Sequence, residues 1–283
     1  MIERNPFLAL ALTTLVGIGI IIALYISLND PGPPPETEQE RFDRVHTVFV
    51  EALAGGAAWS GRVEILGLQT NRTAAHTPGW QVTGTGGACD ASGSYTIRDR
   101  PANPLAIMAP HSQSDTHTGE LAQLLFEQAN ARAVAFNTAP RRATDECESG
   151  IDLTNDRWNP FSAFALAFAD SNRDGLVVQL HGYEESGGNT SQGVEVLIGA
   201  GLGASQRVNA SLSLCFSETL GGREIRVVAS DAAASNAQGQ VLQVQGHRNF
   251  VYIELSEELR QAMLSDAALR GGFESCLIAA TDA

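Results

Sequence analysis

Short apolar runs alternate with longer helical runs in the middle of this chain, and this alternation limits it to few folds. Strands are predicted over 105–109, 131–136 and 176–180, because each is a short apolar run bounded by polar or turn residues. Helices are predicted over 118–130 and 160–170. Helices that connect successive strands favour an α/β fold with a mostly parallel or mixed central sheet and helices on both faces.

Other elements have weaker signals. Asn159 is a typical helix cap and Pro160 suits a first helical turn, which supports the helix that follows them. Residues 187–246 are rich in Gly, Ser, Ala and Gln, and we assign them no role. Further predictions are a helix over 41–53, β-structure within 59–96, strands over 194–198, 225–229, 241–244 and 250–255, and a helix capped at Ser256.

The amino-terminal part carries an apolar segment over residues 7–28 that contains no charged side chain. At about 1.5 Å per residue, a helix of this length crosses a hydrocarbon core of roughly 30 Å, so we predict a transmembrane anchor over residues 1–30. A cleavable signal peptide is the alternative, although its apolar region should be only about 7 to 15 residues long. The Pro- and Glu-rich residues 31–40 would form a stalk, and residues 41–283 the main domain.

The charges that flank the apolar segment indicate its orientation. Arg4 precedes the segment, whereas the residues after it carry four acids and no base before Arg41. A positive-inside bias then places the main domain outside the cytoplasm. We therefore expect a single-pass protein of a bacterial inner membrane, with its domain in the periplasm or outside the cell.

The four cysteines fit such an oxidising compartment. They are widely spaced and form no C-x-x-C pair, which argues against a cysteine zinc site or a thioredoxin-type motif. Disulfides are predicted instead. Three pairings are open among Cys89, Cys147, Cys215 and Cys276.

Composition excludes several functional classes. All 18 basic residues are arginine, so Schiff-base chemistry, a Walker-type phosphate loop and a serine–lysine dyad are excluded. The net charge of -14 argues against a nucleic-acid partner. A serine hydrolase is disfavoured because the sequence has no G-x-S-x-G elbow.

Metal-ligand residue types follow two of the predicted strands. His111 lies two residues after the strand over 105–109, Asp115 follows four positions later, and His181 directly follows the strand over 176–180. Ligands of α/β proteins bind at the carboxyl ends of the strands. Two histidines and a carboxylate are typical ligands of a hydrolytic zinc ion, which keeps a further position open for water. We therefore predict a Zn2+ site formed by these three side chains.

Glu254 is the single acid in the apolar strand over 250–255, where a carboxylate is costly to bury without a partner. Such burial raises a carboxyl pKa toward neutrality, which suits a general base. The alternative is a structural ion pair with an arginine. A binding domain has no need of an acid facing a metal, so this residue separates an enzyme from a binding domain.

Three segments resemble those of a known family. They are Ala109-Pro110-His111 followed by Asp115, Thr118, Leu121 and Ala122; Leu180-His181-Gly182; and Ile253-Glu254-Leu255-Ser256 with Arg260 one helical turn on. Together they resemble the zinc carboxypeptidase-like amidohydrolases, nearest the poly-γ-glutamate hydrolase branch and more distantly the N-formylglutamate amidohydrolases. The resemblance implies the zinc carboxypeptidase-like (phosphorylase/hydrolase-like) fold, zinc bound by His111, Asp115 and His181, and Glu254 as the general base.

The chain departs from that family at its second ligand. Asp115 stands where the family usually has a glutamate, and it lies one position nearer the histidine than in the poly-γ-glutamate hydrolases. Capping of the helix that begins near Thr118 is an alternative role for Asp115. His117 competes with it as a ligand, but we expect His117 and Thr118 to support the ligands rather than to bind the metal.

These expectations lead to a membrane-anchored, extracytoplasmic, zinc-dependent amidohydrolase or peptidase. Arg141 follows a predicted strand, and its planar guanidinium suits a substrate carboxylate. The substrate would be an amide bond next to an amino-acid or carboxylate group, as in γ-glutamyl or cell-wall peptides. The alternative is a non-catalytic anchored domain of the same fold that binds cell-wall peptide or a protein partner.

Overall fold

The computed structural model describes residues 36–283 apart from 57, 75, 184–192, 200–205 and 229–230. Contacts divide the chain into two units, Met1–Thr37 and Glu38–Ala283, and every element named below belongs to the second. The predicted anchor over 7–28 lies outside the described residues. In the part of the chain that is described, no helix combines the length and apolarity needed to cross a membrane.

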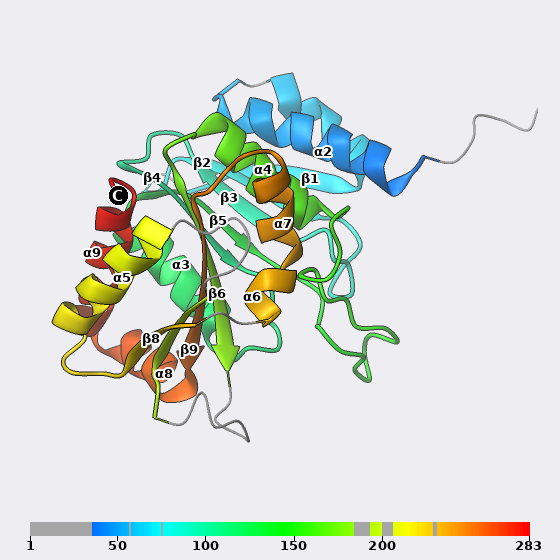
Figure 1. Ribbon diagram of the computed structural model, residues 1–283. Helices are drawn as coiled ribbons and strands as arrows, with labels where there is room; N and C mark the ends of the chain where they lie inside the picture. The colour runs from blue at the N-terminus through cyan, green and yellow to red at the C-terminus, as the bar shows by residue number, and fades with distance from the viewer. Residues whose placement is uncertain (1–35, 57, 75, 184–192, 200–205, 229–230) are drawn as a thin grey trace, which may run out of the picture. The chain divides into compact units, whose positions relative to one another are not determined.

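The second unit is built on one mixed sheet (Figure 1). Among the described residues, the strand order is β1-β2-β3-β5-β4-β6-β9-β7-β8. The central strands β5, β4, β6 and β9 run parallel, β1 to β3 extend the sheet antiparallel beside β5, and β7 pairs antiparallel with β9. The sheet is therefore mixed, which was one of the two predicted forms. Its strands are β1 (Leu68–Arg72), β2 (Gly79–Gly84), β3 (Ser94–Arg98), β4 (Asn103–Ala109), β5 (Ala131–Phe136), β6 (Leu176–Tyr183), β7 (Val196–Gly199), β8 (Ile225–Val228) and β9 (Phe250–Ser256).

Helices cover both faces of this sheet, as predicted (Figure 1). The helices form two layers, and each layer packs on the sheet through its own group of buried apolar side chains. One group contains Phe49 and Phe164, and the other contains Phe126 and Phe273. The first layer holds α2 (Glu38–Leu53), α4 (Pro160–Ser171), α6 (Asp231–Ser235) and α7 (Ala237–Val244). The second holds α3 (Thr118–Gln128), α5 (Gln206–Thr219), α8 (Glu257–Ser265) and α9 (Ala267–Ala280).

The central elements begin and end close to their predicted positions. β5 spans the predicted strand over 131–136, and α3 begins at the predicted Thr118. Asn159 caps α4, since its side chain accepts a hydrogen bond from the Ser162 N–H at 2.8 Å. β6 continues to Tyr183, past its predicted end, because it pairs with β9 from Val177 to Tyr183.

Two stretches of predicted β-structure are wrong. Residues 241–244 lie in α7, where the Asn236 side chain caps the first turn by accepting from the Gly239 N–H at 3.1 Å. The first part of the predicted β-region forms two short 3-10 helices, Ala58–Arg62 and Glu64–Leu66. Val63 and Leu66 are buried there, and their spacing of three suits a 3-10 helix. Runs this short do not separate strand from helix by periodicity alone.

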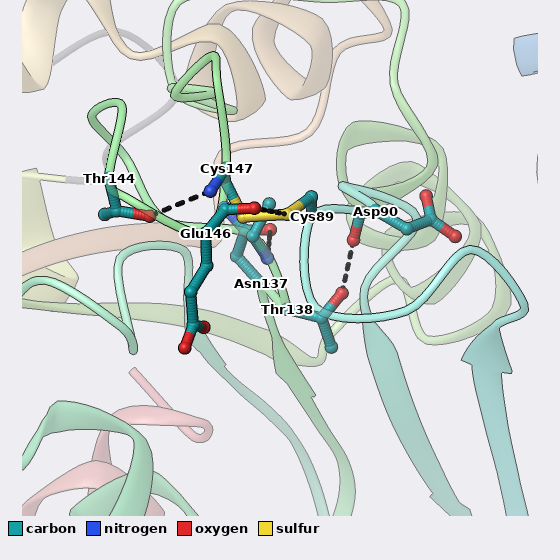
Figure 2. Close-up of a disulfide and its surroundings, with 8 residues drawn as sticks. Cys89, Asp90, Asn137, Thr138, Thr144, Glu146 and Cys147 are labelled. Atoms are coloured by element: carbon teal, nitrogen blue, oxygen red, sulfur yellow. Dashed lines mark hydrogen bonds between the residues drawn. A yellow bond between two sulfur atoms is a disulfide. The ribbon is translucent and has the colours of Figure 1, made fainter.

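The cysteines form two disulfides, which confirms their predicted state and selects one of the three pairings. Cys215–Cys276 joins α5 to α9 on one face of the sheet. Cys89–Cys147 joins the β2–β3 connection to the long connection between β5 and α4 (Figure 2). We call this second connection, residues 137–159, the β5–α4 loop.

Candidate metal centre

The turn after β4 brings His111 and Asp115 together. The His111 carbonyl accepts hydrogen bonds from the N–H groups of Ser114 and Asp115, at 2.8 and 2.7 Å. Thr118 is buried and closes the turn, because its Oγ1 donates to the Asp115 carbonyl at 2.7 Å. As a result, His111 Nδ1 lies 3.6 Å from Asp115 Oδ2.

Strands β6 and β9 bring His181 and Glu254 side by side. The two residues are register partners in adjacent parallel strands. Side chains two residues apart share a face of the sheet, so Gln179 and Tyr252 lie on the same face as this pair. The Tyr252 ring stacks on His181 with centroids 4.4 Å apart, and its hydroxyl donates to Glu254 Oε1 at 2.7 Å.

Three ligand atoms converge where the β4 turn meets β6. His111, Asp115 and His181 each offer one ligand atom within 4.8 Å of the other two. His181 Nδ1 lies 3.7 Å from Asp115 Oδ2, and this oxygen also accepts the Gly182 N–H at 2.9 Å. His111 Nδ1 is buried and has no hydrogen-bond partner. A buried polar atom without a partner is costly, and a bound cation at this point would remove that cost.

The hydrogen bonds of the outer ring nitrogens, Nε2 of His111 and of His181, leave both Nδ1 atoms able to bind a cation. His111 Nε2 lies 2.9 Å from Asp152 Oδ1, and His181 Nε2 lies 3.0 Å from Gln179 Oε1. A carboxylate oxygen and an amide oxygen accept hydrogen bonds, so both Nε2 atoms carry the proton. The lone pairs on Nδ1 therefore face Asp115. Metal-binding histidines in proteins are held in this way, so the three residues fit a zinc ion.

Local charges shift the pKa values of all three candidate ligands. Burial opposes ionisation of Asp115, but its close contacts with His111 and His181 and the hydrogen bond from the Gly182 N–H outweigh burial and hold the pKa of this carboxyl well below its usual range. Burial lowers the pKa of His181 to about 4. Burial also acts to lower the pKa of His111, yet the carboxylates of Asp115 and Asp152 more than reverse this and raise it. An anionic carboxylate and a neutral His181 are the protonation states that a metal requires.

Glu254 keeps a raised pKa beside this cluster. Burial is the main cause, and the negative charge of Asp115 adds to it, whereas the hydrogen bond from Tyr252 and the charge of Arg141 oppose it. Among the described residues no arginine lies within ion-pair distance of Glu254, so the structural ion pair considered above is not observed. A half-buried carboxyl with a raised pKa can accept a proton closer to neutral pH than an ordinary glutamate can.

The β5–α4 loop supplies Asp152 and Arg141. The Arg141 Nε donates to Asp152 Oδ2 at 2.7 Å, so the carboxylate joins Arg141 to His111. The Arg141 side chain is 40% exposed, and its two terminal nitrogens make no hydrogen bond to a described residue. The shared partner Asp152 places Arg141 close to His111, and its positive charge acts to lower the pKa values of His111, His181 and Glu254.

The β5–α4 loop is bonded both to the β2–β3 connection and to the turn after β4. Figure 2 shows the Cys89–Cys147 disulfide together with a hydrogen bond from Thr138 Oγ1 to the Asp90 carbonyl, of 2.5 Å. On the side of the β4 turn, Ser112 Oγ donates to the Asn137 carbonyl at 2.7 Å. The loop that carries Asp152 and Arg141 is therefore fixed to the turn that carries two of the candidate ligands.

Arg260 ties the same turn to β9. This buried arginine in α8 donates from Nε to the Thr116 carbonyl at 2.8 Å and from a terminal nitrogen to the Leu255 carbonyl. Glycine at position 182 is needed for this contact, because an added Cβ would lie 2.4 Å from the Arg260 guanidinium. Arg260 therefore has a structural role at the site.

Asp115 lies where it was predicted, whereas His117 has no observed contact with the ligands and the alternative capping role of Asp115 is not observed. His117 adopts a left-handed conformation, with φ of 70°, at the start of α3, and its ring has no hydrogen bond to the described residues. It is not among the three residues whose ligand atoms converge. The carboxylate of Asp115 accepts from Gly182, and the α3 cap position is His117, so Asp115 does not cap this helix.

Asp152 and Gln179 were not predicted from the sequence. Asp152 is an acid within a long loop, and no local pattern distinguishes it from its neighbours. Gln179 carries a weak signal, since it is the only polar residue among Val177, Val178 and Leu180 and stands two positions before His181. A polar side chain inside a buried strand needs a partner.

No known protein family and no curated protein matches the chain, but solved structures do. An aspartoacylase family protein from Mesorhizobium loti is 12% identical with a TM-score of 0.40, over 75% of this chain and 68% of that one. A putative carboxypeptidase from Burkholderia mallei is 12% identical with a TM-score of 0.43, over 88% and 68%. N-acetylmuramoyl-L-alanine amidase from Clostridium difficile is 15% identical with a TM-score of 0.35, over 63% and 97%. Similarity at these scores assigns no family and no activity to this chain, so the poly-γ-glutamate hydrolase branch stays a prediction.

Proposed function

We propose that this protein is a zinc-dependent amidohydrolase or peptidase, anchored in the membrane by residues 7–28 with its domain outside the cytoplasm. The observation that carries the proposal is the convergence of His111 Nδ1, His181 Nδ1 and Asp115 Oδ2, with both outer ring nitrogens already held by acceptors. Structural zinc sites are closed by four protein ligands, whereas hydrolytic sites use three. Three described residues converge here, which favours a hydrolytic site.

The residues around the cluster divide the remaining chemistry. A zinc ion, when bound, would polarise the scissile carbonyl and lower the pKa of the attacking water. Glu254 would accept a proton from that water and deliver it to the leaving amine, and its raised pKa suits both transfers. The Tyr252 hydroxyl holds Oε1 of this carboxyl, which leaves Oε2 for the proton.

Arg141 gives the proposal its substrate class. Its Nε is bonded to Asp152, so the guanidinium is held in place, while its terminal nitrogens have no hydrogen-bond partner among the described residues and can bind a ligand. A guanidinium binds a carboxylate through two parallel hydrogen bonds. We therefore propose an amide bond next to an amino-acid or carboxylate group as the substrate. γ-Glutamyl and cell-wall peptides carry such groups and fit the proposed location.

The test replaces Glu254 by glutamine in the full-length chain. Glu254→Gln should retain its zinc, because the residue is not a ligand, while hydrolysis should fall by about two to four orders of magnitude. Glu257→Gln is the matched control, since Glu257 is exposed three positions further on in α8. Metal analysis and turnover of a panel of γ-glutamyl and cell-wall peptides give the two readouts.

Each outcome has a definite meaning. A zinc-loaded Glu254→Gln variant with undiminished turnover would exclude Glu254 as the base. A wild-type protein that binds zinc but hydrolyses no peptide of the panel would favour the non-catalytic binding domain instead.

A further inference from the structure

Four buried polar side chains form a connected network beneath the metal centre. Gln179, Asn236, Gln238 and Ser162 are each between 0% and 1% exposed. They come from β6, α7 and its cap, and α4, on the face of the sheet covered by α2, α4 and α7. Buried polar groups need complete hydrogen bonding, so a network of this kind has one preferred arrangement.

Backbone groups set the direction of the hydrogen bonds at both ends of this network. The side-chain oxygen Oδ1 of Asn236 accepts from the Gly239 N–H at 3.1 Å, so the side-chain nitrogen Nδ2 must face Gln179. The Gln238 amide nitrogen donates to the Leu153 carbonyl at 2.8 Å, so its oxygen must face Gln179. Backbone donors and acceptors cannot exchange roles, and neither end amide can flip without losing such a bond.

Gln179 is therefore held in one orientation. Its nitrogen donates to Gln238 Oε1 at 3.0 Å, and its oxygen accepts from the Asn236 amide. The same oxygen faces His181 Nε2 at 3.0 Å. A flipped Gln179 would place an NH2 group against the Asn236 NH2 group and its oxygen against Gln238 Oε1.

We infer that Gln179 is a positioning residue of the metal centre, which sets the tautomer of His181 by presenting an acceptor to Nε2 that the amide network prevents from flipping. His181 then carries its proton on Nε2 and presents the lone pair of Nδ1 to Asp115 and a bound metal. The inference rests on the proposed metal site, but it does not depend on the substrate or on Glu254. His111 is held differently, because its partner Asp152 is a carboxylate with two equivalent oxygens.

The first test measures zinc affinity with a competing chelator in the full-length chain. Gln179→Leu keeps most of the side-chain volume but removes the acceptor, and it should weaken zinc binding by about 10- to 100-fold, as loss of a histidine's outer partner does. Gln179→Glu keeps an oxygen that faces His181 but sets its other oxygen against Gln238 Oε1, so it should recover only part of that affinity. Ser162→Ala is the matched control, because it leaves Gln238 bonded to the Leu153 carbonyl and does not touch His181. It should change zinc affinity by less than about twofold, even though it removes a buried hydrogen bond.

The second test needs no substitution at Gln179. In the metal-free wild-type chain at about pH 8, where imidazoles are neutral, nitrogen NMR of labelled histidine should show His181 protonated on Nε2. The His181→Gln variant assigns that signal. A proton on Nδ1 would overturn the inference even if no Gln179 variant folds.

The two proposals fail separately. If the wild-type chain binds no zinc, the proposed function fails, while the tautomer measurement still decides the role of Gln179. If the wild type binds zinc and Gln179→Leu binds it equally well, the inference about Gln179 is wrong and the metal site stands.

Discussion

His111, Asp115 and His181 lie at the carboxyl ends of β4 and β6, whereas His46, Asp170 and His247 form a second group at the opposite edge of the sheet. Asp170 is the last residue but one of α4, just before β6 begins, and His247 precedes β9 by three residues. Both groups contain two histidines and one aspartate. Only the carboxyl edge is the usual ligand-binding edge of an α/β sheet.

The two groups use their ring nitrogens in opposite ways. His46 Nε2 and His247 Nε2 bond to different oxygens of Asp170, at 2.9 and 2.8 Å, and the carboxylate is 39% exposed. In the candidate metal centre, by contrast, each Nε2 bonds to an acceptor on the side away from Asp115, and each Nδ1 faces the same oxygen of the half-buried Asp115 carboxylate. Among the described residues, only His111, Asp115 and His181 bring three ligand atoms within 4.8 Å of one another. The partner of the outer nitrogen, rather than the residue types, makes a set of histidines fit a metal.

The largest effect is expected from removing a ligand. His181→Ala should reduce bound zinc from about one ion per chain to a trace, because it deletes one of three ligand atoms. The matched change at the opposite edge, His247→Ala, should leave the zinc content unchanged. Metal analysis of both full-length variants after equilibration with zinc measures the difference. Equal losses in the two variants would contradict the contrast between the groups.

A smaller effect is expected from the disulfide that holds the β5–α4 loop. The two disulfides close similar lengths of chain, with sequence separations of 58 and 61, so removing either should cost about 2–4 kcal/mol of unfolding free energy. Removing Cys89–Cys147 by serine substitution should also weaken zinc binding by about tenfold, because it loosens the loop that carries Asp152.

Serine substitution of Cys215–Cys276 is the control for this effect. It should lower the unfolding free energy but leave zinc affinity unchanged, because this disulfide joins two helices that contribute no candidate ligand. Urea unfolding and chelator competition separate the two quantities. Unchanged zinc affinity without Cys89–Cys147 would show that Asp152 does not depend on the disulfide.

Proton release on zinc binding should distinguish the two histidines of the metal centre. The pKa of His111 is raised, so below that pKa the metal-free residue is charged and must lose its Nδ1 proton to bind zinc. The pKa of His181 is lowered to about 4, so this residue is already neutral. Zinc binding should release more protons at about pH 6 than at about pH 8, with His111 contributing up to about one proton. Calorimetry in buffers of different ionisation enthalpy measures this number, and constant release across that range would contradict the prediction.

The smallest effect is expected at the second group. Asp170→Asn weakens both of its histidine contacts, but partly exposed pairs of this kind contribute only about 0–1 kcal/mol each. The unfolding free energy should therefore fall by no more than about 2 kcal/mol, and the zinc content should not change. A loss of bound zinc in Asp170→Asn would mean that this group, too, binds the metal.

Local chemistry in the sequence determined the central elements and the residue types of the site. The cap at Asn159, the apolar run of β5 and the start of α3 at Thr118 are set by neighbours in sequence, so they were predicted close to their observed positions. The convergence of His111, Asp115 and His181 was predictable because parallel strands bring their carboxyl ends together. The predictions failed in short runs such as 241–244, where a cap and packing against α4 select a helix over a strand.

Only the tertiary structure decided which nitrogen of each histidine faces the metal centre. Asp152 reaches His111 from 41 residues away in sequence, through a loop that Cys89–Cys147 holds in place. Gln179 is close to His181 in sequence, but its orientation depends on Asn236 and Gln238, more than 50 residues later. A tautomer depends on the direction of hydrogen bonds, and that direction is set by groups that meet only when distant segments pack together.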